Sequence, residues 1–326
     1  MKILVTGATG FLGHHLVKKL KKGGYQIKIL KEKSASTKLL DRDIKKIEIV
    51  EGDIRNQEDV ESAVNGCDVV FHLVGMISYW NKLNNLQKEI NVEGTKNVVN
   101  ACLKYNAKLI YASSNTTIGV EKEKLADENT IYNLFPLKIN YCDTKFLAEV
   151  EVYKGIAKGL EAIIICPASM YGEGDTRKIK TDMTFDFEFP LNLFYPSGGI
   201  SVVDVEDVAE GMIKAWHKEK NGERYIFVGE NLSFYQIRKT IAKELGKKPP
   251  FLRIPAQLFS ILSYVFLGIS KITGKKPKLT PEIASFNKIK FHFSNKKAKK
   301  ELKIEFTTFK ESIKKAIAWY KENGYL

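Results

Sequence analysis

Short apolar runs alternate with amphipathic stretches through the first half of the chain. The apolar runs are typical of buried strands, and hydrophobic positions three and four residues apart are typical of helices. The predicted strands are Ile3–Thr6, Ile27–Leu30, Ile47–Val50, Val69–Leu73, Leu109–Ser113 and Ala162–Cys166. The predicted helices are Phe11–Lys22, Asn56–Val64, Leu86–Lys104 and Ile139–Lys158. This alternation predicts an α/β fold, a doubly wound parallel sheet (Rossmann fold) with helices on both faces.

The alternation loosens after Gly172, where we place a domain boundary. Residues 1–172 form the predicted sheet domain. The stretch 173–199 is long and mixed, which is typical of a functional or disordered loop. A helix after Val202–Val208, a strand at Arg224–Val228 and helices at Phe234–Leu245 and Phe309–Asn323 complete the pattern. We expect 173–326 to form mainly a smaller C-terminal substrate-binding lobe, with segments near 200–230 returning to the first domain.

One C-terminal stretch, Ile254–Ser270, contains no charged residue. It is slightly shorter than a typical membrane span and carries a narrow polar stripe at helical spacing. We expect a helix buried against the C-terminal lobe, with one face over a substrate pocket. The alternative is peripheral membrane contact through 254–270, with Arg253 and Lys271 at its ends.

Composition narrows the class of protein. The chain has 326 residues and is 44% hydrophobic, which is enough to bury a sizeable core. Its four cysteines are far apart, with no CxxC pair, and no signal peptide is apparent, so we expect a reduced cytoplasmic protein without a metal site. The net charge of +14 comes from lysines scattered over the whole chain. That favours a solvated lysine-rich surface and no nucleic-acid partner.

Three glycines connect the first predicted strand to the first predicted helix, at Gly7, Gly10 and Gly13. The first permits a tight turn, the second lets the backbone approach a pyrophosphate, and the third lets the helix lie close to the sheet. The helix N-terminus offers N–H groups and a positive dipole end to phosphates. We therefore expect a dinucleotide to bind at Gly7, Thr9, Gly10, Phe11, Leu12 and Gly13.

The end of the second predicted strand bears on the choice between NAD and NADP. An acidic side chain there would hold the adenosine ribose of NAD, and a basic one would accept the 2′-phosphate of NADP. Lys31 stands where an NAD-type Asp would be expected, which favours NADP, and Glu32 leaves NAD open. After the third strand, Asp53 either accepts a hydrogen bond from the adenine amino group or caps the next helix.

Tyr141 and Lys145 lie four residues apart and therefore on one face of a predicted helix. A lysine cation beside a phenol favours the phenolate and lowers its pKa, which would make Tyr141 an acid–base group near neutral pH. Ser113 and Ser114 close the preceding strand, which places their hydroxyls at the carboxyl edge of the sheet, where ligands bind in doubly wound folds.

Seven short motifs stand in the order and spacing of a known enzyme family. They are TGATGFLG at 6–13, GDI at 52–54, HLVG at 72–75, NVEGTKNVV at 91–99, YASS at 111–114, YCDTK at 141–145 and PASMYG at 167–172. By these motifs nearly the whole chain resembles an extended short-chain dehydrogenase/reductase, of the NAD-dependent epimerase/dehydratase superfamily. It is most similar to the dihydroflavonol-4-reductase-like branch, which includes hopanoid-associated sugar epimerase-like proteins. Four C-terminal runs carry this part of the resemblance: Gly222–Ile226, Gly229–Ser233, Ala318–Tyr320 and Asn323–Leu326.

The resemblance implies a catalytic set of Ser114, Tyr141 and Lys145. Tyr141 would protonate or deprotonate the reacting oxygen, Ser114 would hold that oxygen, and Lys145 would tune Tyr141. Ser114 is preferred to Ser113 because it stands five residues before Gly119, as in the family pattern. Tyr141 and Lys145 would also contact the cofactor, together with Asp53, Ile54, Leu73, Val74, Gly75, Pro167, Ser169 and Met170.

Two departures from relatives bear on the reaction. Cys166 and Ser169 stand where sugar-nucleotide enzymes of the family usually carry Arg and Asn, so a nucleotide diphosphate would lack two usual partners. Asn115-Thr116 replaces the Asp-Glu pair of sugar dehydratases, which argues against dehydration.

We therefore expect an NAD(P)-dependent reductase or dehydrogenase that moves a hydride to or from a carbonyl or alcohol carbon. The alternatives are a nucleotide-sugar epimerase with retained NAD and a non-catalytic dinucleotide-binding scaffold docked on a membrane. A partly apolar small-molecule substrate is expected from the aromatic and aliphatic content of Met76–Trp80, Phe185–Tyr195 and Leu258–Phe266. By resemblance, the helices at Leu86–Lys104 and Ile139–Lys158 predict a homodimer.

Overall fold

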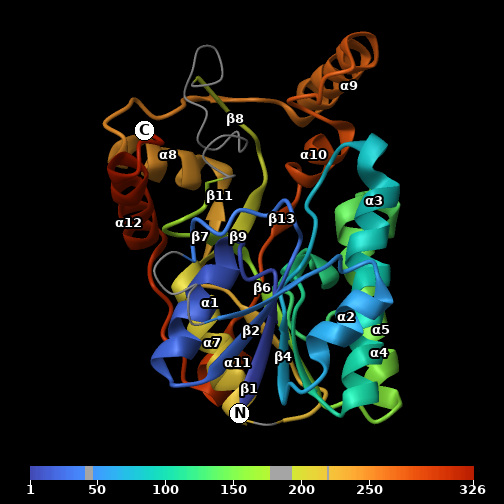
Figure 1. Cartoon of the computed structure of the whole chain (residues 1–326). Coiled ribbons are helices and arrows are strands. Elements are labelled where there is room, and N and C mark those ends of the chain that lie inside the picture. Colours follow the sequence, from blue (N-terminus) through green and yellow to red (C-terminus); the bar gives the residue numbers. More distant parts are fainter. Residues whose placement is uncertain (41–46, 177–192, 219) are drawn as a thin grey trace.

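A seven-stranded parallel sheet forms the centre of the molecule (Figure 1). The computed structural model describes residues 1–40, 47–176, 193–218 and 220–326. The strand order is β3-β2-β1-β4-β5-β6-β10, which confirms the predicted doubly wound fold. The strands are β1 (Lys2–Thr6), β2 (Gln26–Lys31), β3 (Glu48–Glu51), β4 (Val69–His72), β5 (Lys108–Ala112), β6 (Ala162–Pro167) and β10 (Arg224–Phe227).

Helices cover both faces of this sheet (Figure 1). One layer holds α1 (Phe11–Lys22), α7 (Val205–Lys218) and α11 (Lys296–Leu302), and in it α1 packs against α7. In the other layer α4 packs between α2 and α5. That layer consists of α2 (Gln57–Val64), α3 (Asn84–Lys88), α4 (Gly94–Tyr105) and α5 (Asn140–Ala157), with a π-helical turn at Glu89–Glu93 between α3 and α4.

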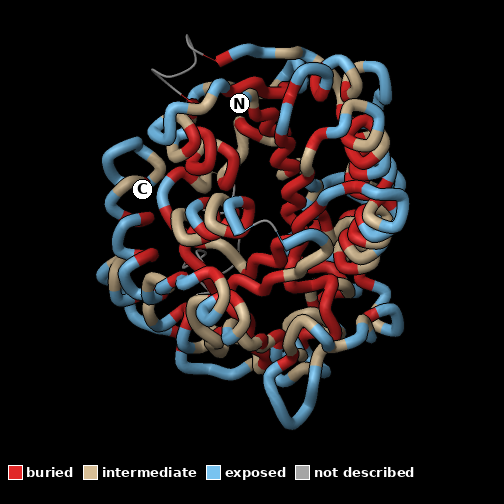
Figure 2. The backbone as a smooth tube through the Cα atoms, turned by 90° about the horizontal axis from the view of Figure 1, so that it is seen from below, coloured by how far each residue is buried: buried red, intermediate tan, exposed pale blue. Residues whose placement is uncertain are grey.

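The central strands β1, β4, β5 and β6 are largely apolar on both sides because both faces of the sheet are covered there. Every residue of β4 and β6 is buried, and Leu4, Phe71, Ile110 and Ile164 have no exposed surface. Figure 2 shows these buried segments running through the middle of the molecule, with exposed segments around them. The core is therefore organised around the sheet, as the continuous apolar runs predict.

The order of the strands reverses beside β1, because β2 and β3 lie on one side of it and β4 to β6 on the other. Thr6 and His72 are paired residues at the carboxyl ends of β1 and β4. Ligands of doubly wound folds bind in the crevice at such a reversal. The glycine turn after Thr6 opens at this point.

A smaller set of elements lies beyond the carboxyl edge of the sheet (Figure 1). Its four-stranded sheet pairs β7, β11 and β13 with a central β9, and a separate pair joins β8 to β12. The strands are β7 (Ser169–Tyr171), β8 (Phe194–Tyr195), β9 (Gly199–Asp204), β11 (Glu230–Ser233), β12 (Leu252–Arg253) and β13 (Lys290–Phe291). The helices are α8 (Phe234–Glu244), α9 (Ala256–Thr273), α10 (Pro281–Phe286) and α12 (Phe309–Glu322).

Helix α9 corrects one expectation from the sequence. The stretch Ile254–Ser270 is helical over most of its length, but it is not buried: only 17% of α9 is inside the molecule. Its buried residues are Phe259, Ser263 and Ser270. The expected burial is wrong because α10 and the segment before it cover one narrow face of α9. By length and composition alone, α9 could also cross a membrane.

Candidate active site

The glycine turn has the geometry that a dinucleotide requires. Gly7 has a φ of 72°, and a Cβ there would lie 3.0 Å from the backbone nitrogen of Val74. A Cβ on Gly13 would lie 2.1 Å from the carbonyl oxygen of Gly7, so side chains are excluded at both positions. Gly10 begins α1 without a side-chain cap, which leaves the first N–H groups of the helix to an anion. The turn therefore fits the pyrophosphate of a nicotinamide dinucleotide.

The segment after β4 crosses beside this turn. The backbone N–H of Leu73 donates to the carbonyl oxygen of Thr6 over 3.2 Å, which brings Leu73, Val74 and Gly75 past the glycines. The Asn91 side chain fixes the next residue, Met76. Its Oδ1 accepts from the Met76 N–H at 2.7 Å, and its Nδ2 donates to the Met76 carbonyl at 3.1 Å. Hydrogen bonds thus fix the backbone of the segment that is predicted to line the cofactor.

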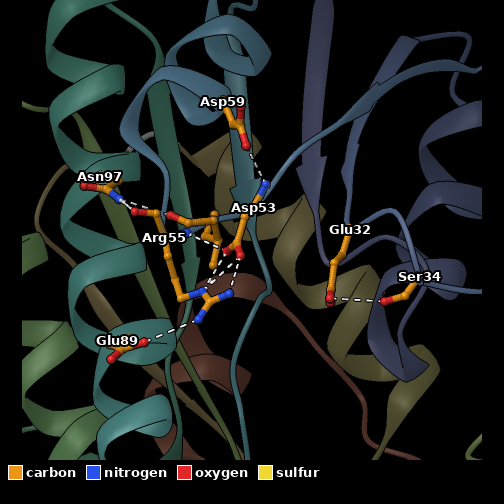
Figure 3. A network of polar contacts seen from close by, with 8 residues as sticks. Glu32, Ser34, Asp53, Arg55, Asp59, Glu89 and Asn97 are labelled. Carbon is orange, nitrogen blue, oxygen red and sulfur yellow. Dashed lines mark hydrogen bonds and ion pairs between the residues drawn. The ribbon is translucent and has the colours of Figure 1, made fainter.

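Lys31 does not point toward a ribose phosphate. Its side chain is buried, its amine donates to the carbonyl oxygens of Glu32 and Lys33, each at 3.1 Å, and it lies 3.3 Å from the Glu51 carboxylate. Glu32 is exposed just beyond the end of β2 and accepts a hydrogen bond from the Ser34 hydroxyl (Figure 3). Lys31, which favours NADP in the sequence, is therefore bound to other protein groups. The Glu32 carboxylate is exposed and can accept hydrogen bonds from a ribose.

Asp53 binds Arg55, and Arg55 reaches on to Glu89 (Figure 3). This pairing holds the pKa of the Asp53 carboxyl below its ordinary value. Asp53 is not the cap of the next helix, because the Asn56 side chain accepts the capping bond of α2. The side chain of Ile54 is buried in the core, so only its backbone can border a cofactor.

Tyr141, in the first turn of α5, is half-buried beside Ser114 at the end of β5. Burial raises the pKa of Tyr141 to about 12, and hydrogen bonding to Ser114 opposes that rise. The Ser114 oxygen accepts from the hydroxyl of Thr116 at 2.9 Å, so its own proton remains to be donated. Ser113 instead donates to the Glu149 carboxylate at 2.5 Å. Of the two serines, Ser114 is the one placed beside Tyr141.

Lys145 is buried one helical turn after Tyr141. Its amine donates to the Tyr111 hydroxyl at 2.8 Å and to the carbonyl oxygen of Ala112 at 3.0 Å. Burial lowers the pKa of Lys145 to about 8, and the nearby Glu149 carboxylate opposes that shift. The amine is thus held at the carboxyl end of β5, with a pKa well below that of an ordinary lysine.

These values correct the expected electrostatics of the pair. The sequence predicts that Lys145 lowers the pKa of Tyr141, but the pKa of Tyr141 is raised. The physical reason is desolvation, since removing the phenol from water disfavours the phenolate more than the surroundings favour it. Tyr141 is therefore a protonated phenol at neutral pH.

The remaining predicted cofactor residues follow β6. Pro167 ends β6, and β6 pairs with β5, so Pro167 lies at the same sheet edge as Ser114. Ser169 and Met170 belong to β7, which pairs with β9 and leads into the C-terminal lobe. They stand at the junction of the main sheet and that lobe.

Three residues that support the candidate site are not predicted by the sequence: Tyr111, Asn91 and Glu149. Tyr111 and Asn91 stand inside the motifs YASS and NVEGTKNVV, so their positions were visible but their roles were not. Glu149 accepts from Ser113, from Thr117 at 2.7 Å and from Arg224 at 2.8 Å, all beneath the predicted catalytic set. Only the spacing of four residues after Lys145 could have indicated Glu149.

A small cavity of about 120 Å³ lies near Tyr141. The ring of Tyr79 packs edge-on against Tyr141, with 6.1 Å between ring centroids, and Tyr79 also lines the cavity. The other lining residues are Trp80, Asn81, Leu267, Thr280, Pro281 and Glu282.

The residues that line this cavity can be compared with the three segments that the sequence predicts to line the substrate pocket. Tyr79 and Trp80 come from the predicted lining segment Met76–Trp80. The predicted segment Leu258–Phe266 is largely exposed, so it does not line this cavity as expected. Most of Phe185–Tyr195 lies outside the described residues.

A doubly wound sheet, a glycine turn for a pyrophosphate and a Ser–Tyr–Lys set define a nicotinamide-dinucleotide enzyme of the extended short-chain dehydrogenase/reductase type. The comparisons agree. The model of the NAD dependent epimerase/dehydratase family matches residues 3–228, and the chain belongs to that family.

Named relatives include both reductases and sterol enzymes. The chain is 28% identical to the "Putative dihydroflavonol 4-reductase" of Synechocystis sp., over 99% of this chain and 95% of that protein. It is 25% identical to "Sterol demethylase protein B" of Methylococcus capsulatus over the whole of both chains. The crystal structure of gox2253 is 29% identical, covers 99% of both chains and has a TM-score of 0.84.

Proposed function

We propose that this protein is an NAD(P)-dependent reductase or dehydrogenase in which Tyr141 is the acid–base group. The observation that carries the proposal is geometric: Tyr141, in the first turn of α5, lies beside the Ser114 hydroxyl at the sheet edge where the glycine turn opens. A group that donates a proton to a carbonyl oxygen must hold that proton at working pH. The bound nicotinamide would supply or accept the hydride.

Three side chains of the protein have separate roles in the proposed reaction. Ser114 donates a hydrogen bond that holds the reacting oxygen, and Tyr141 gives or takes its proton. Lys145 contributes a cation at the end of β5, where its contacts with Tyr111 and Ala112 fix the amine in place. A fixed charge that needs no reorganisation stabilises charge developing on the substrate.

NAD is the cofactor that the adenosine end favours. Glu32 is exposed beyond β2, where a carboxylate can accept bonds from the ribose hydroxyls of NAD and would repel the 2′-phosphate of NADP. The basic alternative, Lys31, is held by two backbone carbonyls and by Glu51. We therefore favour NAD over NADP, contrary to the preference drawn from the sequence.

The substrate is a mid-sized, partly apolar ketone or alcohol. Aromatic rings continue from Tyr141 through Tyr79 to the partly buried Phe286, with centroid separations of 6.1 and 6.2 Å. Such a row suits an apolar ring system better than a sugar nucleotide. The sterol enzyme among the relatives points to the same class of substrate.

Cofactor consumption distinguishes a reductase from an epimerase. The purified protein is passed through a desalting column, loaded with NADH or NADPH, and assayed with a panel of sterol ketones by loss of absorbance at the reduced nicotinamide. We expect exchangeable cofactor and one NADH oxidised per ketone reduced. NAD that leaves the protein only on denaturation, with no net oxidation of NADH, would support the epimerase and contradict the reductase.

A further inference from the structure

Helix α9 presents two different faces. The inner face is formed by Phe259, Ser263 and Ser270, which are buried, and it packs on α10 and Leu279. The outer face is apolar and exposed, and we define it as the docking face. It consists of Leu258, Ile261, Leu262, Tyr264, Val265, Phe266, Ile269 and Ile272. In Figure 1, α9 stands out from the body at the edge of the molecule.

The surroundings of the docking face are basic. Between Glu244 and Glu282 the chain has no acidic residue. All the basic residues in that interval are exposed: Lys247, Lys248, Arg253, Lys271, Lys275, Lys276 and Lys278. An apolar helical face with cations at both ends matches the chemistry of an anionic bilayer surface, with acyl chains inside and phosphate groups outside.

The topology excludes a single crossing of the membrane by α9. The chain before α9 pairs in β12 with β8, and the chain after it returns to the same body, where β13 pairs with β9. A single crossing would place these two flanks on opposite sides of a bilayer. A contact between α9 and a bilayer is therefore made from one side, which fits a helix lying in the plane of the membrane surface.

Charge also disfavours a second copy of this chain as the occupant. A two-fold interface brings the same patch of both subunits together. Joining two docking faces would bring two sets of these basic residues close to one another with no acidic partner from the same segment. An anionic bilayer supplies the missing opposite charge.

We propose that the docking face of α9 binds in the plane of an anionic lipid bilayer and holds the enzyme on its surface. Leu267 of α9 lines the same cavity as Tyr79, and the Tyr79 ring packs against Tyr141. Docking would therefore place the membrane beside a cavity next to the Tyr141 ring, where an apolar substrate could approach. That consequence rests on the proposed function, because it requires an apolar substrate, whereas the docking itself does not.

Vesicle flotation tests the docking without any turnover. The full-length protein is mixed with vesicles of phosphatidylcholine alone or with phosphatidylglycerol, at low and high salt, and centrifuged through a density gradient. We expect flotation with the anionic vesicles, weakened by salt and weak with neutral vesicles. Wild-type protein that stays at the bottom with anionic vesicles overturns the proposal.

Variants locate the contact. Ile261→Glu combined with Val265→Glu changes two exposed residues of the docking face and should weaken binding roughly tenfold or more. Ile131→Glu places the same charge at an exposed isoleucine outside α9 and should float like the wild type. A second variant, Lys275→Glu with Lys276→Glu, leaves the apolar residues intact and should also weaken binding. Unchanged flotation of both double variants overturns the proposal.

Light scattering tests whether a second copy of this chain, rather than a bilayer, covers the docking face. If the wild type is a dimer that Ile261→Glu with Val265→Glu dissociates, and does not float, then the docking face joins two copies and the bilayer proposal is wrong. A loss of NADH oxidation with normal flotation would instead contradict the proposed reaction and leave the docking intact.

Discussion

At the residue scale, the fold shifts the pKa values of two groups in the candidate site. Burial raises the pKa of Tyr141 to about 12 and lowers that of Lys145 to about 8. The YxxxK spacing predicts that both side chains lie on one helix face, and they do. It could not predict the pKa values, because desolvation depends on neighbours such as Tyr79 and Tyr111 that come from other elements.

The pKa of Lys145 sets a pH limit on activity. Because that pKa is lowered to about 8, the amine is charged below this pH and neutral above it. If the cation is the active form, kcat/KM for NADH is high below about pH 8 and falls above it. This profile reports groups of the free enzyme.

Lys145→Arg is the diagnostic variant for this limit. A guanidinium stays charged throughout the range, so the decline near pH 8 should disappear even if the maximal rate is lower. A decline at the same pH in Lys145→Arg would assign it to another group.

Glu32 should control the choice of cofactor. Replacing Glu32 by Arg removes an acceptor for the ribose and adds a partner for the 2′-phosphate. The NADP-to-NAD ratio of dissociation constants should therefore fall by roughly tenfold or more. Thermal-shift titration with both nucleotides measures the ratio, because a ligand of the folded state raises stability with its concentration.

Lys31→Met is the matched control, since the Lys31 amine is already bound to carbonyl oxygens. It should leave the ratio unchanged even if it alters stability. A large change in the ratio for Lys31→Met, with none for Glu32→Arg, would restore Lys31 as the residue that selects the cofactor.

At the element scale, a buried ion pair connects helix α5 to strand β10 beneath the site. The Glu149 carboxylate lies 2.8 Å from the Arg224 guanidinium, and both side chains are largely buried. Arg224→Met would leave the Glu149 charge buried without its cation. Breaking such a pair costs about 3–5 kcal/mol of unfolding free energy.

Urea unfolding measures this loss, with Lys154→Met as the control. Lys154 pairs with Glu151 on the exposed side of the same helix, at 2.7 Å. An exposed pair of this kind contributes about 0–1 kcal/mol. Equal losses in the two variants would mean that the buried pair does not join α5 to β10.

The positions of helices and strands were predictable where the pattern of apolar residues along the chain reflects which positions are buried. The apolar runs of β1, β2, β4 and β6 and the glycine turn before α1 have the predicted positions within one or two residues. Helix α9 was predicted as a helix, but its burial was not predictable. An apolar segment needs a covering partner, and α10 with Leu279 covers only the face that carries Phe259 and Ser263.

At the scale of the whole molecule, the sequence predicts the doubly wound sheet and the C-terminal lobe beyond it. It also predicts a strand at Arg224–Val228 and segments near 200–230 returning to the first domain, but it could not show that β10 would pair with β6 and bring Arg224 beneath Ser113. Such contacts depend on register between segments about sixty residues apart. The homodimer through α4 and α5 and the cytoplasmic location stay predictions.

The central claim is that the Tyr141 hydroxyl carries the proton of the reaction. The most direct measurement compares kcat and the NADH dissociation constant of Tyr141→Phe with those of the wild type, using a sterol ketone found in the panel. Tyr153→Phe, which removes a hydroxyl from a partly exposed residue of the same helix, is the control. We predict that Tyr141→Phe binds NADH normally and loses about 10²–10⁴-fold in kcat, while Tyr153→Phe stays near the wild type. A Tyr141→Phe enzyme with near-normal kcat would contradict the account.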